Sequence, residues 1–299
     1  MLRGLYTATA GMLSQQRRHD AITNNIANLN TPGFKQSQAV TRSFPEMLIR
    51  LLKEQPGGGS TVEWGRLHSG VLAEEAIAIH IQGDLRETGN PLDFAIVSDI
   101  QVEGLVFNNG KTITPEGERV FQPQAFFTVL NADGEERYTR NGQFTVNELG
   151  QLVTAEGFQV LGLDRQPIVL VDPATQEPLS GVTVDKRGFL MHPVTGEPLT
   201  DAAGNSVGLL ISRVENPNRL IPEGLGLYRI APGEEANVAP INPDDQVQVF
   251  QGFVEGANVD PVQSVVDMMT AARLYEANQK VIQAYDRSLE KAANEVGRV

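Results

Sequence analysis

Hydrophobic and polar positions follow a helical period at both ends of the chain. In the C-terminal segment, 254–299, the apolar seam steps by three and four residues through Met268, Ala271, Tyr275, Asn278, Ile282, Tyr285 and Leu289. This is the spacing of a coiled-coil seam. Asp260 marks a helix start because it accepts hydrogen bonds from the first free N–H groups, and Pro261 loses no hydrogen bond at that position. The pattern predicts a long helix from Asp260 onward.

The N-terminal segment, 1–35, repeats the same step. Its seam positions are Leu5, Ala8, Met12, Gln15, His19, Ile22, Ile26 and Leu29. Pro32 and Gly33 then end the helix, since proline cannot continue it and glycine tolerates the change of direction. Two matching seams at opposite ends of one chain predict two helices that pair as an antiparallel coiled coil.

Two interpretations of these seams are open. One is ordinary amphipathic packing of each helix on the core of its own chain. The other is packing between subunits, which the polar seam residues Gln15, His19 and Asn278 favour. Polar groups in a coiled-coil seam cost stability but fix the register, as assembly in a defined geometry requires.

The segment 36–73 has no clear period and is predicted to be a linker with one short helix. Residues 44–53 hold the methionine and leucines of that helix, and residues 56–60 form a flexible glycine-rich tract. A glycine-rich loop that cradles phosphate is followed by Gly-Lys-Ser or Gly-Lys-Thr, and no such sequence follows here.

From 74 to 253 the chain shows short strands and tight turns. A β-hairpin with a type I′ turn is predicted at Asn141 and Gly142. A strand-turn-strand unit at 144–153 is echoed at 182–191. We expect an irregular, mostly antiparallel β domain. The predicted fold class is α+β, with long N- and C-terminal helices pairing as an antiparallel coiled coil and this β domain between them.

Composition limits the possible functions. The net charge of −13 argues against non-specific nucleic-acid binding, which needs a basic surface. The chain has no cysteine, which excludes disulfides and thiolate metal sites. No apolar run reaches the roughly 18 residues that a membrane span needs. Polar residues at 15–18 interrupt any apolar segment near the N-terminus, so no cleaved secretory signal is expected.

The sequence does not assemble a catalytic site. The four histidines are His19, His68, His80 and His192, and they show neither H-x-x-x-H nor H-E-x-x-H spacing. There is no G-x-S-x-G motif for a serine nucleophile. Neighbouring carboxylates such as Glu74 and Glu75 are interpreted as solvated surface. We expect no enzyme activity, no catalytic residue, no metal site and no cofactor.

Several motifs resemble those of the bacterial flagellar rod and hook proteins. They are GM at 11–12, NNIANLNTPGFK at 24–35, YTRNGQF at 138–144, GQLVT at 150–154, GFVEGANVD at 252–260 and RLYEANQKVIQ at 273–283. The terminal motifs are long and specific, and all of them fall in the family's order along the chain.

The resemblance implies a coiled-coil core made from both termini, with a β-rich domain outside it. It also implies export through the flagellar type III apparatus without a cleaved signal, followed by helical self-assembly into the axial structure. The implied partners are further copies of the chain, other rod and hook subunits and the export apparatus. The implied location is the flagellar basal body, outside the cytoplasm, and the chain length resembles that of rod-type members.

One segment departs from the family pattern. LDFAI at 92–96 is separated from FFTV at 126–129 by an apparent insertion near 97–125. Asn109 and Gly110 are predicted to form a hairpin tip within it.

The leading hypothesis is a structural subunit of the flagellar rod. Its predicted assembly interface comprises Leu5, Met12, Ile22, Asn24, Asn25, Ile26, Asn28, Leu29, Met268, Tyr275, Asn278, Ile282, Tyr285 and Leu289. The predicted turn and signature residues are Pro32, Gly33, Phe34, Asn141 and Gly142. The alternative is a secreted module that binds peptidoglycan or another surface and uses its helices only to oligomerise.

Overall fold

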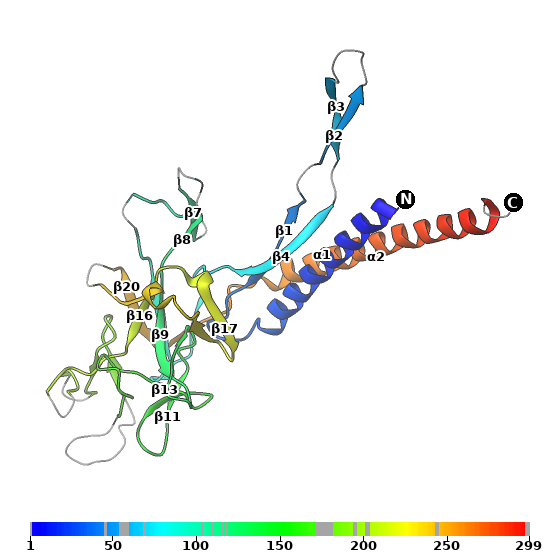
Figure 1. Cartoon of the computed structure of the whole chain (residues 1–299). Coiled ribbons are helices and arrows are strands. Elements are labelled where there is room, and N and C mark those ends of the chain that lie inside the picture. Colours follow the sequence, from blue (N-terminus) through cyan, green and yellow to red (C-terminus); the bar gives the residue numbers. More distant parts are fainter. Residues whose placement is uncertain are drawn as a thin grey trace. The chain divides into compact units, whose positions relative to one another are not determined.

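The computed structural model of the chain describes residues 2–44, 47–53, 60–67, 70–102, 104–108, 110–114, 117, 119–170, 182–193, 196–200, 204–242 and 245–296. The chain divides into two compact units (Figure 1). Unit 1 comprises Met1–Ala27, Ser37–Ile77 and Asp260–Val299, and unit 2 comprises Asn28–Gln36 and Ala78–Val259. Each unit is therefore built from segments that lie far apart in the sequence.

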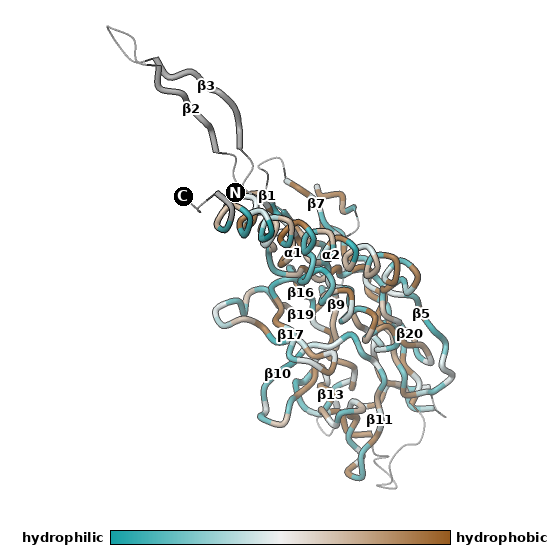
Figure 2. Tube along the Cα trace, turned by 90° about the vertical axis from the view of Figure 1, so that its right-hand side faces the viewer, coloured by the Kyte–Doolittle hydropathy of each residue, from teal (hydrophilic) through white to brown (hydrophobic). Residues whose placement is uncertain are grey.

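Unit 1 contains the two long helices. They are α1 (Leu2–Ala27) and α2 (Pro261–Lys291), and α2 continues into the π-helical turn η3 (Ala292–Val296). The predicted start of α2 is confirmed, because Asp260 Oδ1 accepts hydrogen bonds from the backbone N–H groups of Val262 at 2.8 Å and Gln263 at 3.0 Å. Hydrophilic and hydrophobic residues alternate along both helices (Figure 2). Neither of these described helices is long and apolar enough to cross a membrane.

The prediction of a coiled coil is wrong. The helices do lie side by side and antiparallel (Figure 1), but a coiled coil interlocks apolar side chains along two continuous seams. Only one serine and one alanine of α2 are buried among its described side chains. The close approaches are at glycines: a Cβ at Gly4 would lie 2.2 Å from the Tyr285 hydroxyl, and one at Gly11 would lie 3.0 Å from Asn278 Nδ2. Small and polar residues at the contact bury too little apolar surface for interlocked packing.

The rest of unit 1 consists of two-stranded sheets. Its strands are β1 (Ser37–Ser43), β2 (Met47–Lys53), β3 (Ser60–Leu67) and β4 (Val71–Ala78), and β1 pairs with β4 while β2 pairs with β3. The short helix expected within 44–53 is not found, because residues 47–53 are β2. A helix this short is marginal by itself, whereas the antiparallel partner β3 satisfies the backbone of β2 along its length. Most of the predicted glycine-rich tract lies outside the described residues.

Unit 2 is built from short strands. They are β5 (Leu85–Glu87), β6 (Phe94–Ser98), β7 (Lys111–Ile113), β8 (Arg119–Phe121), β9 (Gln124–Leu130), β10 (Glu136–Thr139), β11 (Phe144–Val146), β12 (Leu152–Thr154), β13 (Gln159–Val160), β14 (Thr183–Val184), β15 (Leu190–Met191), β16 (Ile211–Val214), β17 (Leu220–Gly224), β18 (Leu227–Ile230), β19 (Val238–Pro240), β20 (Val247–Gln251) and β21 (Phe253–Glu255), with 3-10 turns η1 (Pro217–Arg219) and η2 (Glu235–Asn237). The nine-stranded main sheet has the order β11-β12-β13-β9-β10-β18-β17, with β16 pairing with β9 and β19 with β16. Its strand pairs are antiparallel.

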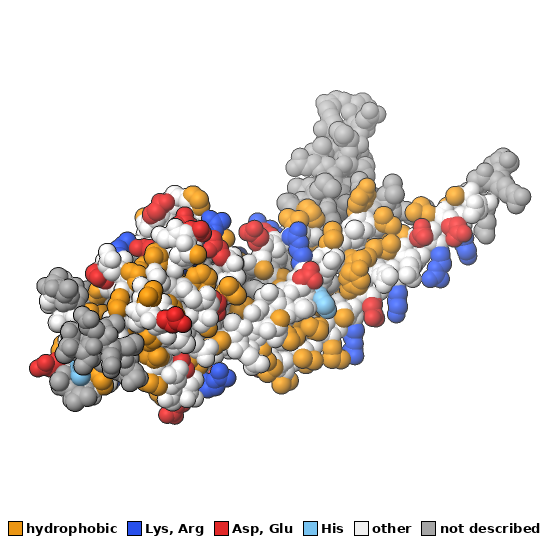
Figure 3. Space-filling view, turned by 90° about the horizontal axis from the view of Figure 1, so that it is seen from below, with side chains coloured by type: hydrophobic (Ala, Val, Ile, Leu, Met, Phe, Trp, Pro, Cys, Tyr) orange, Lys and Arg blue, Asp and Glu red, His pale blue; other side chains and the backbone are white. Residues whose placement is uncertain are grey.

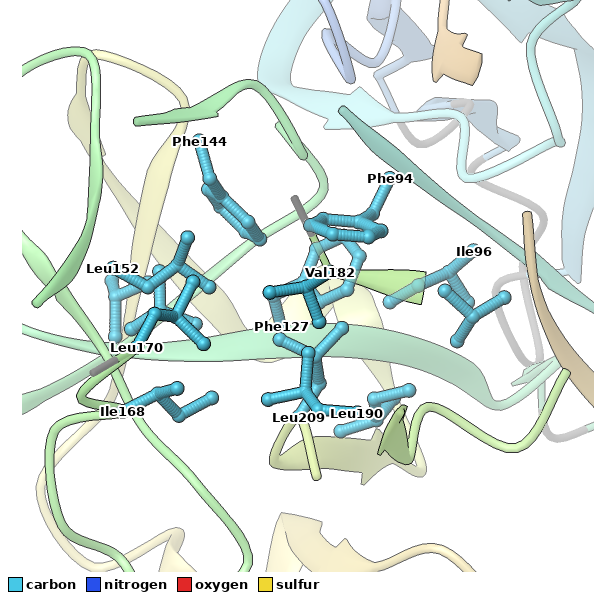
Figure 4. Packing of buried hydrophobic residues seen from close by; sticks show 14 of the residues in the cluster. Phe94, Ile96, Phe127, Phe144, Leu152, Ile168, Leu170, Val182, Leu190 and Leu209 are labelled. Carbon is cyan, nitrogen blue, oxygen red and sulfur yellow. The ribbon is translucent and has the colours of Figure 1, made fainter. Parts of the chain in front are cut away.

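The hydrophobic core of unit 2 gathers around the long central strand β9. Phe127 on β9 is fully buried, and its ring centroid lies 5.2 Å from that of Phe144 in an edge-on contact. Phe94 on β6 lies 5.9 Å from Phe144. Leucine, isoleucine and valine side chains from the surrounding strands and loops converge on these rings (Figure 4).

The hairpin predicted at Asn141 and Gly142 is wrong. Strand β10 pairs with β9 and β18, whereas β11 pairs with β12, so β10 and β11 are not partners. A type I′ turn needs positive φ at both central residues, and neither residue has it. Gly142 serves a close approach instead, because a Cβ there would lie 1.7 Å from the carbonyl oxygen of Phe94.

The predicted repeat of strand, turn and strand is confirmed. Strand β11 pairs with β12 and β14 pairs with β15, both antiparallel. The two turns have the same hydrogen bonds: Gly150 N donates to Asn147 O at 3.0 Å, and Gly188 N donates to Asp185 O at 2.8 Å. Both glycines have positive φ, which explains why glycine recurs at this position of the repeat.

The segment 97–125 contains the β7–β8 hairpin, in which Lys111 lies opposite Phe121. Asn108 and Lys111 exchange backbone hydrogen bonds of 2.9 and 3.3 Å, and Gly110 between them has a φ of 71°. Asn109 of the predicted tip lies outside the described residues.

Candidate functional site

Three segments that are remote in the sequence meet at one buried carboxylate in unit 2. Glu255 Oε1 accepts hydrogen bonds from Lys35 Nζ at 2.6 Å and from Gly83 N at 2.9 Å, and Oε2 accepts one from Arg140 Nε at 2.7 Å. The charged side chains are 0–1% exposed. We call Lys35, Arg140 and Glu255 the buried ion cluster.

Arg140 has acceptors on all sides. Its Nη1 donates to Ala125 O at 2.6 Å, and its Nη2 donates to Gln82 Oε1 at 2.8 Å and to Ile96 O at 3.1 Å. These acceptors belong to β9, β6 and the segment before β5. A planar guanidinium in which every donor is used fixes the positions of the chains around it.

Electrostatics keep the cluster charged although it is buried. Burial lowers the pKa of Lys35 from 10.5 to about 8, the charge of Arg140 acts in the same direction, and Glu255 opposes both. Burial alone would raise the pKa of Glu255, but the charges of Arg140 and Lys35 and their hydrogen bonds hold it below its usual value. At neutral pH the cluster therefore holds two cations and one anion.

His80 lies next to this cluster among aromatic rings. Its ring centroid is 6.3 Å from those of Phe126 and Tyr228. Burial, followed by the charges of Lys35 and Arg140, lowers the pKa of His80 to about 3, so the ring stays neutral. Its role at neutral pH is packing beside the cluster.

Hydrogen bonds donated by backbone N–H groups join the same segments. Gly33 N donates to Glu255 O at 2.8 Å, and Gln36 N donates to Asn258 Oδ1 at 2.6 Å. Gly33 has a φ of 70°, and a Cβ there would lie 2.6 Å from the carbonyl carbon of Arg140. Glycine is therefore needed at position 33 for both backbone conformation and close approach.

The other predicted signature residues lie around this junction. Pro32 and Phe34 are half-buried, and Asn258 N donates to Phe34 O at 3.4 Å. Asn141 is buried, and its Oδ1 accepts a hydrogen bond from Gln143 N at 3.1 Å. Asn141 therefore does not occupy the predicted type I′ turn. Its side chain instead accepts a hydrogen bond that holds the backbone between β10 and β11.

Most of the predicted interface residues of α1 are buried or half-buried within unit 1. Ile22 is buried, while Leu5, Met12 and Ile26 are half-buried. Asn25 is also buried and pairs with the backbone of Ser37, because its Nδ2 donates to Ser37 O at 2.8 Å and its Oδ1 accepts from Ser37 N at 2.9 Å.

Three further predicted residues surround the end of α1. Asn24 is exposed on the last turns of the helix, and Asn28 and Leu29 belong to unit 2, where both are half-buried. Asn28 Oδ1 accepts a hydrogen bond from Thr31 Oγ1 at 3.2 Å. The contact of the predicted α1 residues with another subunit stays a prediction.

The predicted residues of α2 form its least exposed face. Met268, Asn278, Ile282, Tyr285 and Leu289 are half-buried, and Tyr275 is 36% exposed. The contacts at Gly4 and Gly11 show that this face is directed at α1 of the same chain. The seam therefore builds the helix pair, and a role between subunits stays a prediction here too.

The sequence interpretation missed the apolar residues that the helix pair leaves exposed. On the first turns of α2, Val262 is 73% exposed, and Val265, Val266 and Met269 are about half exposed. Among the described side chains of α1, the large apolar ones that are exposed are Tyr6 and Leu13. The sequence does contain a signal for them, because they are apolar residues that lie outside the seam positions of the two helices.

Potential metal ligands and cavities are two further features of the described part of the chain. No group of three histidine, cysteine, aspartate or glutamate side chains is placed to hold a metal ion among the described residues. A cavity of about 500 Å³ lies beside β8, η1 and η2, where Arg219 pairs with Glu234 at 3.3 Å. The buried ion cluster is closed to solvent, which suits a structural role.

The chain matches three family models. They are "Flagella basal body rod protein" over residues 5–35, "Flagellar hook protein FlgE/F/G D1 domain" over 121–191 and "Flagellar basal body rod FlgEFG protein C-terminal" over 251–295. Lys35, Arg140 and Glu255 each lie in a different one of these three ranges. The buried ion cluster therefore joins the three matched segments.

Curated relatives match over nearly the whole length. The chain is 38% identical to the flagellar hook-basal body complex protein FlhO of Bacillus subtilis, with all of both chains covered. It is 32% identical to the flagellar basal-body rod protein FlgG of Agrobacterium fabrum, with 95% of this chain and 96% of the relative covered. It is 30% identical to the FlgG of Caulobacter vibrioides, with 97% of each covered.

We predict that Glu255→Gln strongly destabilises unit 2. The change leaves two buried cations without their counter-charge, and removing one partner of a buried ion pair costs about 3–5 kcal/mol. Urea unfolding followed by tyrosine fluorescence, to which Tyr138 and Tyr228 of unit 2 contribute, measures the loss. Glu136→Gln, which removes a pair with the exposed Arg165, is the control and should cost less than about 1 kcal/mol. Equal stabilities of the two variants would contradict a structural role for the cluster.

We also predict that His80 makes the protein sensitive to acid. The histidine titrates near pH 6.5 in the unfolded chain and near pH 3 in the folded one. Stability is therefore lost as pH falls below 6.5, because only the unfolded chain takes up the proton.

The test of the His80 prediction is the free energy of unfolding at several pH values between 6.5 and 4.5, where Glu255 is still ionised. His80→Phe keeps an aromatic ring beside Phe126 but does not titrate. Its slope should be smaller by up to about 1.4 kcal/mol per pH unit. Identical slopes for both proteins would rule out this role of His80.

Proposed function

The chain belongs to the flagellar basal-body rod protein family, and on that premise we propose that it is a structural subunit of the bacterial flagellar rod that assembles through its helix unit. The family membership covers both terminal helices and the β-rich part between them. Family members of this kind assemble with other axial subunits of the flagellum. We propose that the contacts between copies of this chain are made by unit 1.

The distribution of charge supports this proposal. Unit 2 holds 25 acidic and 12 basic residues, whereas unit 1 holds 12 of each, so the whole net charge of −13 lies on unit 2. Like net charge opposes close association of two copies. Copies of unit 1 meet without that repulsion, and unit 2 is better suited to remain at the periphery of an assembly.

The main support for assembly through unit 1 is a group of exposed apolar residues on α2. Val262, Val265, Val266 and Met269 stand together on the first turns of α2 and are half or more exposed. Contiguous apolar surface of this kind marks interaction sites rather than ordinary solvent-exposed helix. The same residues are covered once helices of neighbouring subunits pack on them.

We further propose that the subunit reaches the rod through the flagellar type III export apparatus without a cleaved signal. Support comes from the family resemblance of the N-terminal motif at 24–35. The alternative, a secreted surface-binding module, assigns the helices to small closed oligomers and the binding activity to unit 2. The two proposals therefore differ in where the protein is found and in what unit 1 forms.

Mass spectrometry of purified hook–basal bodies tests the proposed function. We expect the chain in that preparation, with peptides from both units and an intact N-terminus. Its absence from hook–basal bodies of a cell that carries flagella would contradict the rod assignment. Recovery only in the culture medium or on the cell surface would favour the binding module.

The double variant Val262→Glu, Val266→Glu tests the role of the exposed apolar face. Both side chains point to solvent in the subunit, so the circular dichroism spectrum and unfolding midpoint should change little. Incorporation into hook–basal bodies should fall strongly, because charges would be buried in the contact. Gln279→Glu, Gln283→Glu adds the same charge to exposed polar positions of α2 and serves as the control. Normal incorporation of the first variant would exclude this face from assembly.

A further inference from the structure

A second apolar row runs along α2 beside the face that contacts α1. It consists of Leu274, Ala277, Val281 and Ala284, at steps of three, four and three. We call this row the second seam. All four residues are exposed, Leu274 and Val281 by 43% each. Because successive residues of a helix are roughly 100° apart, the second seam lies about 100° around α2 from the face directed at α1.

A row of basic residues follows one flank of the second seam. Arg273, Lys280 and Arg287 stand at steps of seven, so they lie in line on the helix surface. None of the three makes an ion pair within the described part of the chain. Figure 3 shows basic side chains spaced along this helix, with acidic ones beside them.

The outward face of α1 has the same spacing. Tyr6, Leu13 and Asp20 also stand at steps of seven, and Tyr6 is 71% and Leu13 56% exposed. Asp20 has no ion pair among the described residues, whereas the two arginines before it are engaged inside unit 1. This face therefore offers two apolar side chains and one free carboxylate in line.

The second seam is unsuited to pairing with itself. In an antiparallel self-pairing the flanking residues on one side face the same residues of the other copy, so the basic rows would meet and repel. In a parallel self-pairing the contact would also use the flank that contains Asn278 and Tyr285, which α1 of the same chain already occupies. A symmetric contact through this seam is disfavoured in both orientations.

We propose that the second seam of one subunit binds the outward face of α1 from a second copy of the chain. The inference rests on the proposed function and names the two surfaces that meet. The surfaces differ from each other, so the contact is head-to-tail and leaves both a free second seam and a free α1 face at the ends of every assembly. Repetition of such a contact generates an open helical array rather than a closed dimer.

The equal spacing of the two rows aligns their charges. With Leu13 beside Val281 and at the level of Lys280, an antiparallel arrangement of the helices brings Asp20 to the level of Arg273 and Tyr6 to the level of Arg287. The carboxylate then faces a guanidinium, and the tyrosine ring lies beside another, which is a favourable cation–π arrangement. A parallel arrangement brings Asp20 to the level of Arg287 and Tyr6 to the level of Arg273, so the charges match in both orientations.

Cysteine cross-linking tests this contact directly, because the natural chain has no cysteine. Cells that make both Leu13→Cys and Val281→Cys full-length proteins are oxidised, and the hook–basal bodies are analysed for disulfide-linked dimers. We expect a dimer that contains one copy of each variant. Leu13→Cys with Leu163→Cys, an exposed leucine of unit 2, is the control pair and should give no specific product. A yield no higher than in the control would overturn the proposal.

Charge reversal gives a second, independent test. Asp20→Arg should lower the yield of the Leu13–Val281 cross-link about tenfold, equivalent to about 1.4 kcal/mol. In the partner variant, Arg273→Asp should restore the yield if the helices run antiparallel, and Arg287→Asp should restore it if they run parallel. An unchanged yield with Asp20→Arg, or no recovery with either second change, would contradict the contact. If the chain is present in hook–basal bodies but these pairs do not cross-link, the rod assignment stands and only this contact fails.

Discussion

The burial of the Glu255 carboxylate between Lys35 and Arg140 is the interaction on which unit 2 depends. Ions removed from water are stable only with close partners, and these partners come from positions 220 and 115 residues away. The segment after α1, the chain between β10 and β11, and the end of β21 must therefore be in place together. This requirement explains why Lys35, Arg140 and Glu255, each from a different family-matched segment, lie in one folding unit.

The sequence predicted those features of the fold that depend on residues close together in the chain. Asp260 caps α2 as expected, and the strand-turn-strand repeat forms twice, because capping and tight-turn preferences act over a few residues. The hairpin predicted from Asn141 and Gly142 does not form, because β10 pairs with β9 and β18, and this pairing determines the direction of the chain after β10. The buried ion cluster had no local signal: single lysine, arginine and glutamate residues usually lie on the surface, and only their place in family motifs marked them.

The two helices of unit 1 follow the predicted pattern without forming the predicted coiled coil. The three-and-four step did identify the sides of α1 and α2 that face each other. Glycine, serine and asparagine on those sides allow close approach but bury little apolar surface, so no coiled coil results. The remaining apolar residues, such as Val262 and Val281, are left exposed on outward faces, which are the surfaces proposed for contacts with further copies.

A density map of the isolated hook–basal body, in which the side chains of this protein are resolved, would show directly which surfaces join the subunits. We expect helices of neighbouring subunits to cover the outward faces of α1 and α2, while Glu255 keeps its contacts with Lys35 and Arg140 inside each subunit. Outward helix faces that remain in solvent, with subunits joined through their β-rich units instead, would contradict this expectation.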